Sequence, residues 1–301
     1  MNSRTLIGAT LVFFSAVTFS AKAVIVKLAL GTHQVDPVSL LTLRMAYSFP
    51  FFLLLGILSS RKSSRTPLGL RDVWLILFCG IVGYYLASLF DFLGLQYISA
   101  GLERLILFIY PTLVVLLMAF LYKAPITKRI VLALILSYAG VIFAFLHDFR
   151  RLETGAITGG LFILGSAITY ALYLAVGGQL IHRLGSMRFT ALAMMVSVLA
   201  VCLHFLLTRP PDLLLTLPPE IHGYALLMAL VCTVLPAMLL AAGIKRIGSG
   251  AAAIIGSVGP VSTILLAYWI LHESIDSSHI VGTALVLIGV LMVSTRKTVE
   301  V

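Results

Sequence analysis

The sequence predicts an all-α membrane protein with ten transmembrane helices in two inverted five-helix repeats and with both termini in the cytoplasm. Three observations predict this fold: an apolar composition, an internal repeat and loops whose Lys and Arg residues lie mostly on one predicted side of the membrane. Of the 301 residues, 60% are hydrophobic and 11% are charged, and the mean hydropathy is +1.11. A soluble domain carries about 25% charged residues. The composition therefore indicates a polytopic membrane protein, and we attribute the net charge of +10 to its loops rather than to a nucleic-acid partner.

The second half of the chain repeats the first. The stretch 94–126, GLQYISAGLERLILFIYPTLVVLLMAFLYKAPI, returns at 243–275 as GIKRIGSGAAAIIGSVGPVSTILLAYWILHESI. The matched residues include Gly94 with Gly243 and Pro111 with Pro260 at an offset of 149, and Ser15 with Ser166 at an offset of 151. A fixed period of this length means that one half of the chain is a copy of the other. We therefore expect two repeat units, 1–149 and 150–301.

Each half contains five apolar segments near the length that a membrane span needs, about 20 residues. The predicted spans are Leu6–Leu30, Val38–Leu58, Trp74–Leu95, Leu102–Tyr122 and Ile130–Leu146, followed by Ile157–Ile181, Phe189–Leu207, Tyr224–Gly243, Ala251–Leu271 and Ile280–Val293. The first span imitates a signal peptide, because Ala21-Lys22-Ala23 resembles a cleavage site. Its apolar run continues to Leu30 and has a copy in the second half, so we interpret it as a membrane span.

Positive charges in the loops predict the orientation of the spans. One side of the membrane receives 14 of the loop Lys and Arg residues: Arg4, Arg61, Lys62, Arg65, Arg71, Lys123, Lys128, Arg129, Arg183, Arg188, Lys245, Arg246, Arg296 and Lys297. The other side receives three: Arg150, Arg151 and Arg209. Because cytoplasmic loops carry the excess of Lys and Arg, both termini are expected in the cytoplasm.

Five spans per half is an odd number, so the second copy must enter the membrane upside down. The charges of matched loops agree with this inversion. The loop after span four contains Lys123 and Lys128, whereas its copy after span nine contains Glu273 and Asp276. Inverted repeats of this kind are frequent among secondary transporters.

Six charged side chains fall within the predicted spans or at their edges: Lys22, Lys27, Arg44, Asp91, Glu103 and Arg104. A charge at the centre of a span costs about 2.5–3.5 kcal/mol on insertion scales. Most of these side chains must therefore face the bundle interior or an aqueous cavity. All six lie in the outer half of the first repeat, and most of the matched positions in the second repeat are uncharged.

Helical spacing places polar residues in stripes that could line one passage. Ser15, Thr18 and Lys22 share a face of span one. The candidate solute-pathway residues are Lys22, Asp91, Tyr110, Glu103, Arg44, Tyr84, Ser88, Ser166, Tyr170 and Tyr173. Hydroxyl groups there would orient a small polar solute, and Lys22 or Arg44 could hold a carboxylate. The passage is expected between spans one, three and four and their counterparts six, eight and nine.

A structural interpretation of these residues stays open. Pairs such as Arg44 with Asp91, or Lys22 with Glu103, could neutralise each other and only fix the registry of the helices. Pro111 and Pro260 occupy matched sites inside spans four and nine and are candidate hinges, although ordinary packing explains them equally well. No nucleotide-binding, hydrolase or metal-ligand motif is present, so we expect no enzyme activity, no cofactor and no metal site.

Two runs resemble a known family. VIVKLALGTHQVDPVSLLTLRMAYSF, with Lys27 and Arg44, is similar to the first two spans of EamA-type members of the drug/metabolite transporter superfamily. The run that begins GAAAIIGSVGP and contains Pro260 and Glu273 resembles the closing segment of that family. The resemblance implies a transporter, often an exporter, of amino acids or other small metabolites, with a central cavity between the halves. Ala124 departs from the family pattern, which often has an acidic residue there, and Asp91 and the Glu103–Arg104 pair match no common motif of it.

The sequence thus predicts a secondary transporter in a cytoplasmic (inner) membrane of the bacterial type. It would move a small polar metabolite, an amino acid or a related and in some cases anionic solute, by alternating access and in the direction of export. Its expected partners are the solute and the lipid bilayer. Protons are a candidate coupling ion, because Asp91 or Glu103 could carry one. The alternative is a membrane-embedded binding or assembly protein without transport, whose buried charges only fix helix registry.

Overall fold

The computed structural model describes residues 3–33, 35–62, 67–123, 126–149, 155–256 and 258–294, and all regular elements within these ranges are helices. Seven of the described helices are long and apolar enough to cross a membrane. Three shorter apolar helices, Ile130–Phe143, Val258–Leu271 and Ser277–Met292, coincide with the predicted spans five, nine and ten. The predicted boundary between the repeats borders residues 150–154, and those residues, with Arg65, Arg296 and Lys297, lie outside the described ranges.

The helices of the first half follow the predicted spans closely. They are α1 (Ser3–His33), α2 (Pro37–Lys62), α3 (Leu70–Phe78), the π-helical η1 (Cys79–Leu86), α4 (Ala87–Gly94), α5 (Ala100–Leu107), α6 (Tyr110–Tyr122) and α7 (Lys128–Phe149). Together α3, η1 and α4 form one continuous rod at the place of span three. Span four is broken between α5 and α6, directly before Pro111, because proline cannot continue the hydrogen-bonding pattern of the preceding turn.

The second half has α8 (Ala156–Leu184), α9 (Ser186–Thr208), α10 (Leu213–Thr216), α11 (Pro219–Ala229), the π-helical η2 (Leu230–Val234), α12 (Leu235–Gly256), α13 (Val258–Leu266), the π-helical η3 (Ala267–Leu271) and α14 (Ser277–Ser294). One element differs from the prediction. A loop was expected at Lys245 and Arg246, but α12 continues through both residues, because no proline interrupts the chain between Pro236 and Pro260.

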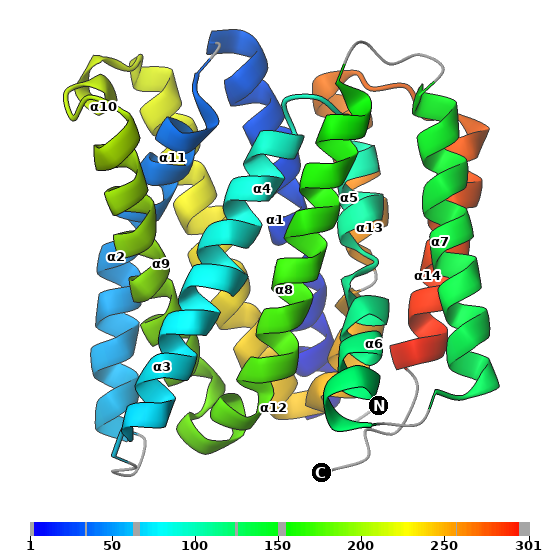
Figure 1. Cartoon of the computed structure of the whole chain (residues 1–301), viewed down its shortest axis with the longest axis horizontal. Helices are drawn as coiled ribbons and strands as arrows, with labels where there is room; N and C mark the ends of the chain where they lie inside the picture. The colour runs from blue at the N-terminus through cyan, green and yellow to red at the C-terminus, as the bar shows by residue number, and fades with distance from the viewer. Residues whose placement is uncertain are drawn as a thin grey trace.

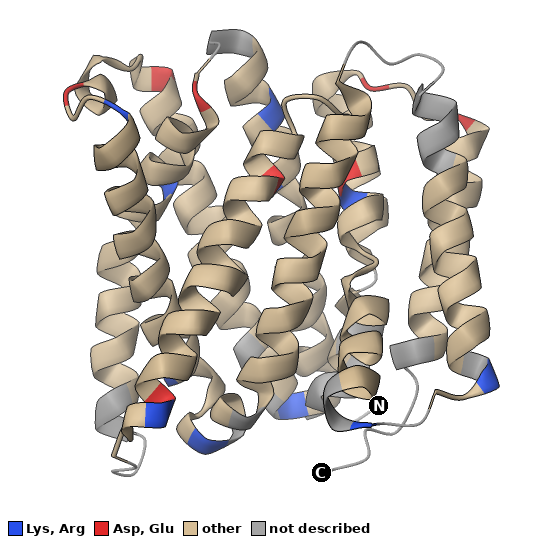
Figure 2. Ribbon diagram, in the orientation of Figure 1, with Lys and Arg blue, Asp and Glu red and all other residues tan. Residues whose placement is uncertain are grey.

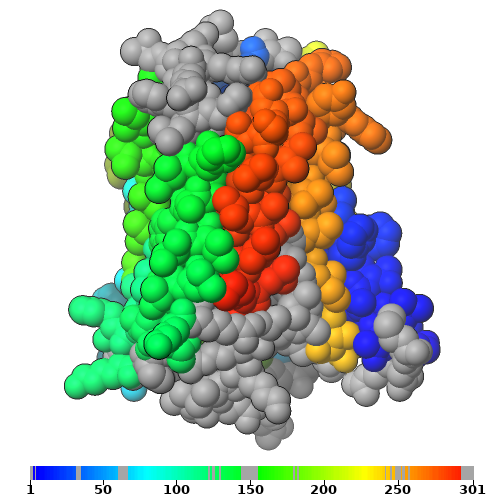
Figure 3. Space-filling view, turned by 90° about the vertical axis from the view of Figure 1, so that its right-hand side faces the viewer, coloured from blue at the N-terminus to red at the C-terminus, as the bar shows by residue number. Residues whose placement is uncertain are grey.

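The main helix pairs each join a helix of one half to a helix of the other half (Figure 1). α1 packs against α12 of the second half, and the matched helices α4 and η1 pack against α8 in the same way. The remaining two pairs each join a helix to its own copy, α2 to α9 and α7 to α14. Figure 3 shows the α7–α14 pair side by side on one face of the molecule. This pairing is what an internal two-fold relation between the halves requires.

The closest helix contacts occur in matched copies. The Ser15 hydroxyl of α1 donates a hydrogen bond of 2.8 Å to the Pro236 carbonyl of α12. The Ser166 hydroxyl of α8 donates one of the same length to the Ala87 carbonyl of α4. Glycines face each other at both junctions: a Cβ built on Gly243 would lie 3.1 Å from the Gly8 carbonyl oxygen, and one built on Gly159 would lie 3.1 Å from that of Gly94. Small residues thus allow the backbones of the two halves to approach closely.

The exterior of the bundle is apolar and the charges gather at its ends. Large hydrophobic side chains such as Phe120, Leu207 and Trp269 are more than 70% exposed, as lipid contact requires. α1 begins and α14 ends at one end of the bundle, which we call the lower end; α1 ends and α5 begins at the opposite, upper end. Figure 2 shows Lys and Arg dominating the lower end, while acidic residues are prominent at the upper end.

Candidate functional site

Three of the predicted pathway residues meet in one buried cluster in the upper half of the bundle. Lys22 of α1 donates a hydrogen bond of 2.6 Å from Nζ to Asp91 Oδ2 of α4. The same Nζ lies 3.6 Å from Glu103 Oε1 of α5. Asp91 is 1% exposed and Glu103 is fully buried. One ammonium group is therefore shared between two carboxyl groups from different helices, out of contact with solvent.

Arg104 closes this cluster on the side of the second half. Its Nε donates a hydrogen bond of 2.9 Å to Thr263 Oγ1 of α13 and lies 3.9 Å from Glu103 Oε2. The Arg104 guanidinium and the Lys22 ammonium both lie over the ring of Phe19, at 5.1 and 5.4 Å from its centroid. Cation–π contact lowers the cost of holding two cations away from water. The cluster thus joins α1, α4, α5 and α13, which come from both halves.

Arg44 of α2 is buried but has no carboxylate within ion-pair distance among the described residues. Its Nε donates a hydrogen bond of 3.0 Å to Thr233 Oγ1 of η2, and its guanidinium lies 5.5 Å from the centroid of the Phe92 ring. Its Nη1 has no hydrogen-bond acceptor. Of the two pairs named in the structural interpretation, Lys22 with Glu103 lies within ion-pair distance, whereas Asp91 is bonded to Lys22 rather than to Arg44. Arg44 keeps an unneutralised charge inside the bundle.

The four candidate tyrosines form a second cluster. The hydroxyls of Tyr84 (η1) and Tyr173 (α8) are hydrogen-bonded at 2.9 Å. Tyr170 stacks on Tyr173, with ring centroids 5.6 Å apart, and meets Tyr110 of α6 edge-on at 5.0 Å. η1, α6 and α8 thus bring together side chains that lie far apart in the sequence. Such a group offers apolar ring faces together with hydroxyl groups, which suits a small amphipathic solute.

The remaining candidates have local roles in the structure. The Ser166 hydroxyl is engaged in the helix contact with Ala87. Ser88 lies half-buried on α4, one turn before Asp91. Pro111 stands in the first turn of α6, directly after the break in span four, and the matched Pro260 lies within α13.

The upper ends of spans four and nine are tied together by Glu273. Its Oε1 accepts a hydrogen bond of 3.0 Å from the Ala100 amide, and its Oε2 accepts one of 3.3 Å from the Gly101 amide. These amides belong to the first turn of α5, where helical N–H groups lack partners within the helix. A carboxylate at this position also interacts favourably with the helix dipole. Glu273 therefore acts as a cap supplied by the other half of the chain.

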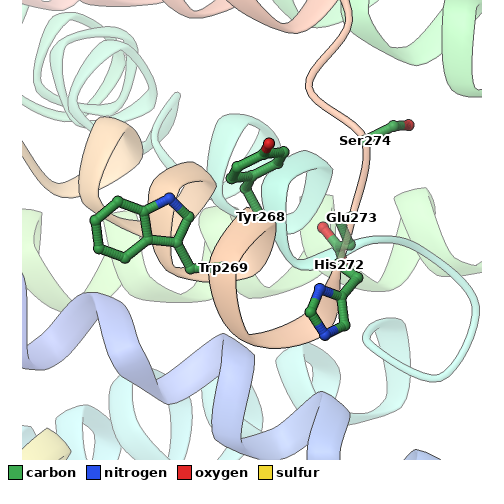
Figure 4. Close-up of a pocket in the computed structure, with 5 residues that line it drawn as sticks. All are labelled: Tyr268, Trp269, His272, Glu273 and Ser274. Atoms are coloured by element: carbon green, nitrogen blue, oxygen red, sulfur yellow. The ribbon is translucent and has the colours of Figure 1, made fainter.

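Next to this contact lies an open depression of about 540 Å³ lined by Tyr268, Trp269, His272, Glu273 and Ser274 (Figure 4). It contains none of the residues of the two clusters. Trp269 and Tyr268 are largely exposed, as aromatic side chains at a membrane–water interface commonly are. The buried clusters, rather than this depression, are the candidate site.

Several residues of the site were not among the sequence candidates. Thr233 and Thr263 bind the two buried guanidinium groups, and Phe19 lies beneath two cations. Threonine and phenylalanine are ordinary inside membrane helices, so periodicity gives no signal for them. Glu273 was noted as a matched acidic position, but its contact with α5 requires the fold.

Comparisons with known proteins give a consistent result. A model of the EamA-like transporter family matches residues 6–146 and 157–295. An uncharacterized transporter of Bacillus subtilis, YcbK, is 28% identical over 295 residues, which cover 96% of this chain and 93% of that protein. An uncharacterized transporter of Synechocystis, sll1319, is 26% identical over 326 aligned positions, covering 99% of this chain and 96% of that protein. A crystal structure of a protein with 19% identity has a TM-score of 0.64 and covers 97% of this chain and 96% of that one, which is a likeness of fold alone.

Proposed function

Because the chain belongs to the EamA-like transporter family, an integral multi-pass membrane family of transporters rather than enzymes, we propose that it is a secondary transporter of a small polar metabolite. The proposed solute is an amino acid or a related compound with an anionic group. The proposed mechanism is alternating access between the two halves, with export as the proposed direction.

The observation that carries this proposal is the unneutralised guanidinium of Arg44. A buried charge without a counter-ion in contact is costly, and protein interiors rarely retain one without a function. Arg44 Nη1 lacks an acceptor, and Asp91 Oδ1 on the neighbouring helix α4 lacks a donor. A solute that carries a carboxylate and an amino group would satisfy both atoms. The lysine of the charged cluster, in contrast, is already occupied by Asp91.

Three features support the inverted, ten-span arrangement with units 1–149 and 150–301. The main helix pairs each join the two halves, and the serine contacts of α1 and α8 are copies of each other. Lys and Arg also dominate the end of the bundle at which α1 begins and α14 ends. By the positive-inside rule this lower end is cytoplasmic. Pro111, beside the break between α5 and α6, and the matched Pro260 in α13 are the proposed hinges.

Proton coupling is part of the proposal. The carboxyl groups of Asp91 and Glu103 lie 2.6 and 3.6 Å from the same Lys22 Nζ, and two buried carboxylates that share one cation are difficult to ionise together. A proton bound between them would be released when the solute or water enters. We expect flux into liposomes to respond to an imposed pH gradient in the natural protein and to lose that response in Glu103→Gln. A flux that is insensitive to the gradient in both proteins would exclude this coupling.

The test of function begins with purified protein and a thermal-shift screen against amino acids, nucleosides and sugar phosphates. The stabilising compound is then used in radiolabelled form for flux into liposomes. Arg44→Gln is expected to reduce both the thermal shift and the flux at least tenfold, because it removes the charge that the anionic group meets. Arg71→Gln, at an exposed position of α3, is the matched control and should leave both unchanged.

The same experiment distinguishes transport from the alternative of a binding or assembly protein. Binding of a compound by the natural protein without flux would favour that alternative. Equal flux in the Arg44→Gln and natural proteins would contradict the assignment of Arg44 to the solute site.

A further inference from the structure

We propose that Glu273 is a one-sided latch that biases the transporter towards the conformation closed at its upper end. The proposal rests on the transport function proposed above and adds a residue that determines how the protein distributes between its two conformations. It follows from one contact, from its local geometry and from the residue that stands at the matched position in the other half.

The contact joins spans four and nine at the upper end of the bundle. A solute that moves from the charged cluster to the upper side would pass between these two spans. α5 carries Glu103 and Arg104 one turn beyond the amides of Ala100 and Gly101 that Glu273 holds. α13 carries Thr263, which accepts the hydrogen bond from Arg104. The cluster is therefore covered by α5 and by the segment after η3, which the Glu273 contact holds together. Opening the upper end by parting spans four and nine must break both hydrogen bonds of Glu273.

The local backbone aims this carboxylate at α5. His272, directly before Glu273, has a left-handed backbone conformation with φ 56°. Such conformations are uncommon for residues other than glycine and turn the chain sharply at a helix end. Lys27 of α1 adds electrostatic attraction to the same carboxylate. The placement of Glu273 is thus built into the end of span nine.

The other half has the same turn but lacks the carboxylate. Lys123, which matches His272 at the offset of 149, is left-handed with φ 54°. These two are the only residues other than glycine with positive φ in the described ranges. The residue that follows Lys123 is Ala124, where Glu273 stands in the second half. Ser249 and Gly250, which match Ala100 and Gly101, lie inside the continuous helix α12 rather than in a first turn. The contact made by Glu273 therefore has no counterpart in the other half, because the matched positions supply neither the carboxylate nor first-turn amides.

An inverted repeat changes conformation by exchanging the environments of its two halves. In the conformation open at the upper end, an equivalent contact would need a carboxylate at position 124 and a helix that begins at Ser249. Residue 124 is an alanine, and α12 continues through Ser249 and Gly250. The upper-closed conformation therefore has two charge-assisted hydrogen bonds that the other conformation lacks. Loss of one such interaction is expected to change the ratio of the two conformations about tenfold.

Cysteine labelling in membranes tests this bias without a known solute. The reporters are Ile264→Cys, beside Gly101 near the upper end, and the matched Val115→Cys in α6, each in a background with Cys79, Cys202 and Cys232 changed to alanine. A membrane-impermeant maleimide is applied to intact cells and to inverted vesicles. Glu273→Gln keeps one acceptor oxygen and Glu273→Ala keeps none. Upper-side labelling of residue 264 should therefore rise in the order natural protein, Gln, Ala, reaching about tenfold.

Two further variants make the outcome decisive. Ala100→Pro removes one of the two amide donors at the first position of α5, where proline fits a helix, and leaves Glu273 in place, so it should raise labelling at 264 even if the Glu273 variants fold poorly. Glu220→Gln removes a negative charge from the exposed first turn of α11 and should change nothing. A conformational shift must also lower labelling of residue 115 from the opposite side. Unchanged labelling in both Glu273→Ala and Ala100→Pro, or a rise at 264 without a fall at 115, would overturn the latch. Because labelling needs no solute, this result is independent of whether the protein shows flux.

Discussion

Lys22 illustrates how a single residue can have both a structural and a transport role. It was predicted as a pathway residue, and it lies at the centre of the cluster, within 4 Å of two carboxyl groups. Its ammonium group is satisfied, whereas the Arg44 guanidinium is not. A satisfied buried pair is weak evidence for a solute site, and an unsatisfied charge is stronger evidence. The two residues should therefore respond differently to substitution.

Removal of Lys22 alone is expected to destabilise the protein strongly. Lys22→Met leaves Asp91 and Glu103 without their shared cation, and breaking a buried pair on one side costs about 3–5 kcal/mol. The double variant Lys22→Met/Asp91→Leu removes both charges and should recover most of this loss. Thermal unfolding in detergent measures both effects. A double variant as unstable as the single one would show that the pair is not the origin of the loss.

The ion pair of Asp36 and Arg209 gives a pH dependence outside the membrane. Burial alone would raise the pKa of Asp36, but hydrogen bonds from Arg209 and Ser39 outweigh it and hold the pKa below its ordinary value. A lowered folded-state pKa contributes stability above the unfolded value and loses it as the pH falls through the folded one. Asp36→Asn should thus be less stable than the natural protein at pH 7, by less than about 1 kcal/mol for this partly exposed pair. The difference in unfolding temperature should shrink as the pH falls below the ordinary pKa of an aspartate, about 3.9, and vanish once the pH lies below the lowered pKa of folded Asp36. A difference that persists unchanged at low pH would contradict this role.

At the scale of helices, the matched serine contacts make a quantitative prediction. Ser15 and Ser166 donate hydrogen bonds of equal length to backbone carbonyls at equivalent junctions. Ser15→Ala and Ser166→Ala should therefore each reduce the free energy of unfolding by about 1 kcal/mol. Unequal losses, measured by thermal unfolding, would show that the two junctions have diverged in strength.

The α7–α14 pair depends on glycine at its closest approach. A Cβ added to Gly140 would lie 2.7 Å from the Gly282 carbonyl oxygen, and one added to Gly289 would lie 2.6 Å from that of Ala133. Backbone atoms cannot move aside as side chains do, so Gly140→Ala and Gly289→Ala should each destabilise by about 1–3 kcal/mol. Gly178→Ala in α8, where nothing lies within 4 Å, is the control. If both test variants unfold with the same free energy as the natural protein, α7 and α14 can move apart without any loss of stability.

Most helices were predictable because apolar length and the internal repeat are long-range signals. α1 (Ser3–His33) agrees with the predicted Leu6–Leu30 to within three residues at each end. The π-helical segments η1 and η2 were not predictable, because they arise from packing and from the hydrogen-bonding disruption around Pro236 rather than from a periodic pattern. The continuation of α12 through Lys245 likewise shows that two basic residues do not by themselves end a helix.

The orientation of the whole molecule in the membrane is a prediction that fusion reporters can check. Green fluorescent protein fused after residue 301 should fluoresce, and alkaline phosphatase fused there should be inactive, because both termini are expected in the cytoplasm. Phosphatase fused after residue 98 or 275 should be active, since these loops follow spans three and nine. Active phosphatase at the C-terminus would reverse the assignment of the upper and lower ends.

The composition of the site could be predicted only in part. Intramembrane charges mark candidates because their burial is expensive, and Lys22, Asp91 and Glu103 do lie together. Their partners could not be assigned, because helix spacing gives the face of one helix but not the rotation of its neighbour. For the same reason the pair of Arg44 with Asp91 was left open, and the structure shows Arg44 bonded to Thr233.

The matched serine contacts have a consequence for genetics. If one junction is used twice, the tolerance of a scaffold position to substitution should be mirrored by its counterpart about 150 residues away. If the second half of a saturation mutagenesis profile is shifted by about 150 residues onto the first, the two halves should then agree over the scaffold. The two halves of the profile would differ at matched positions such as Lys22 and Tyr173, or Ala124 and Glu273, where the two copies carry side chains of different chemistry. The places where the two halves of the profile disagree would give a map of function that needs no knowledge of the solute.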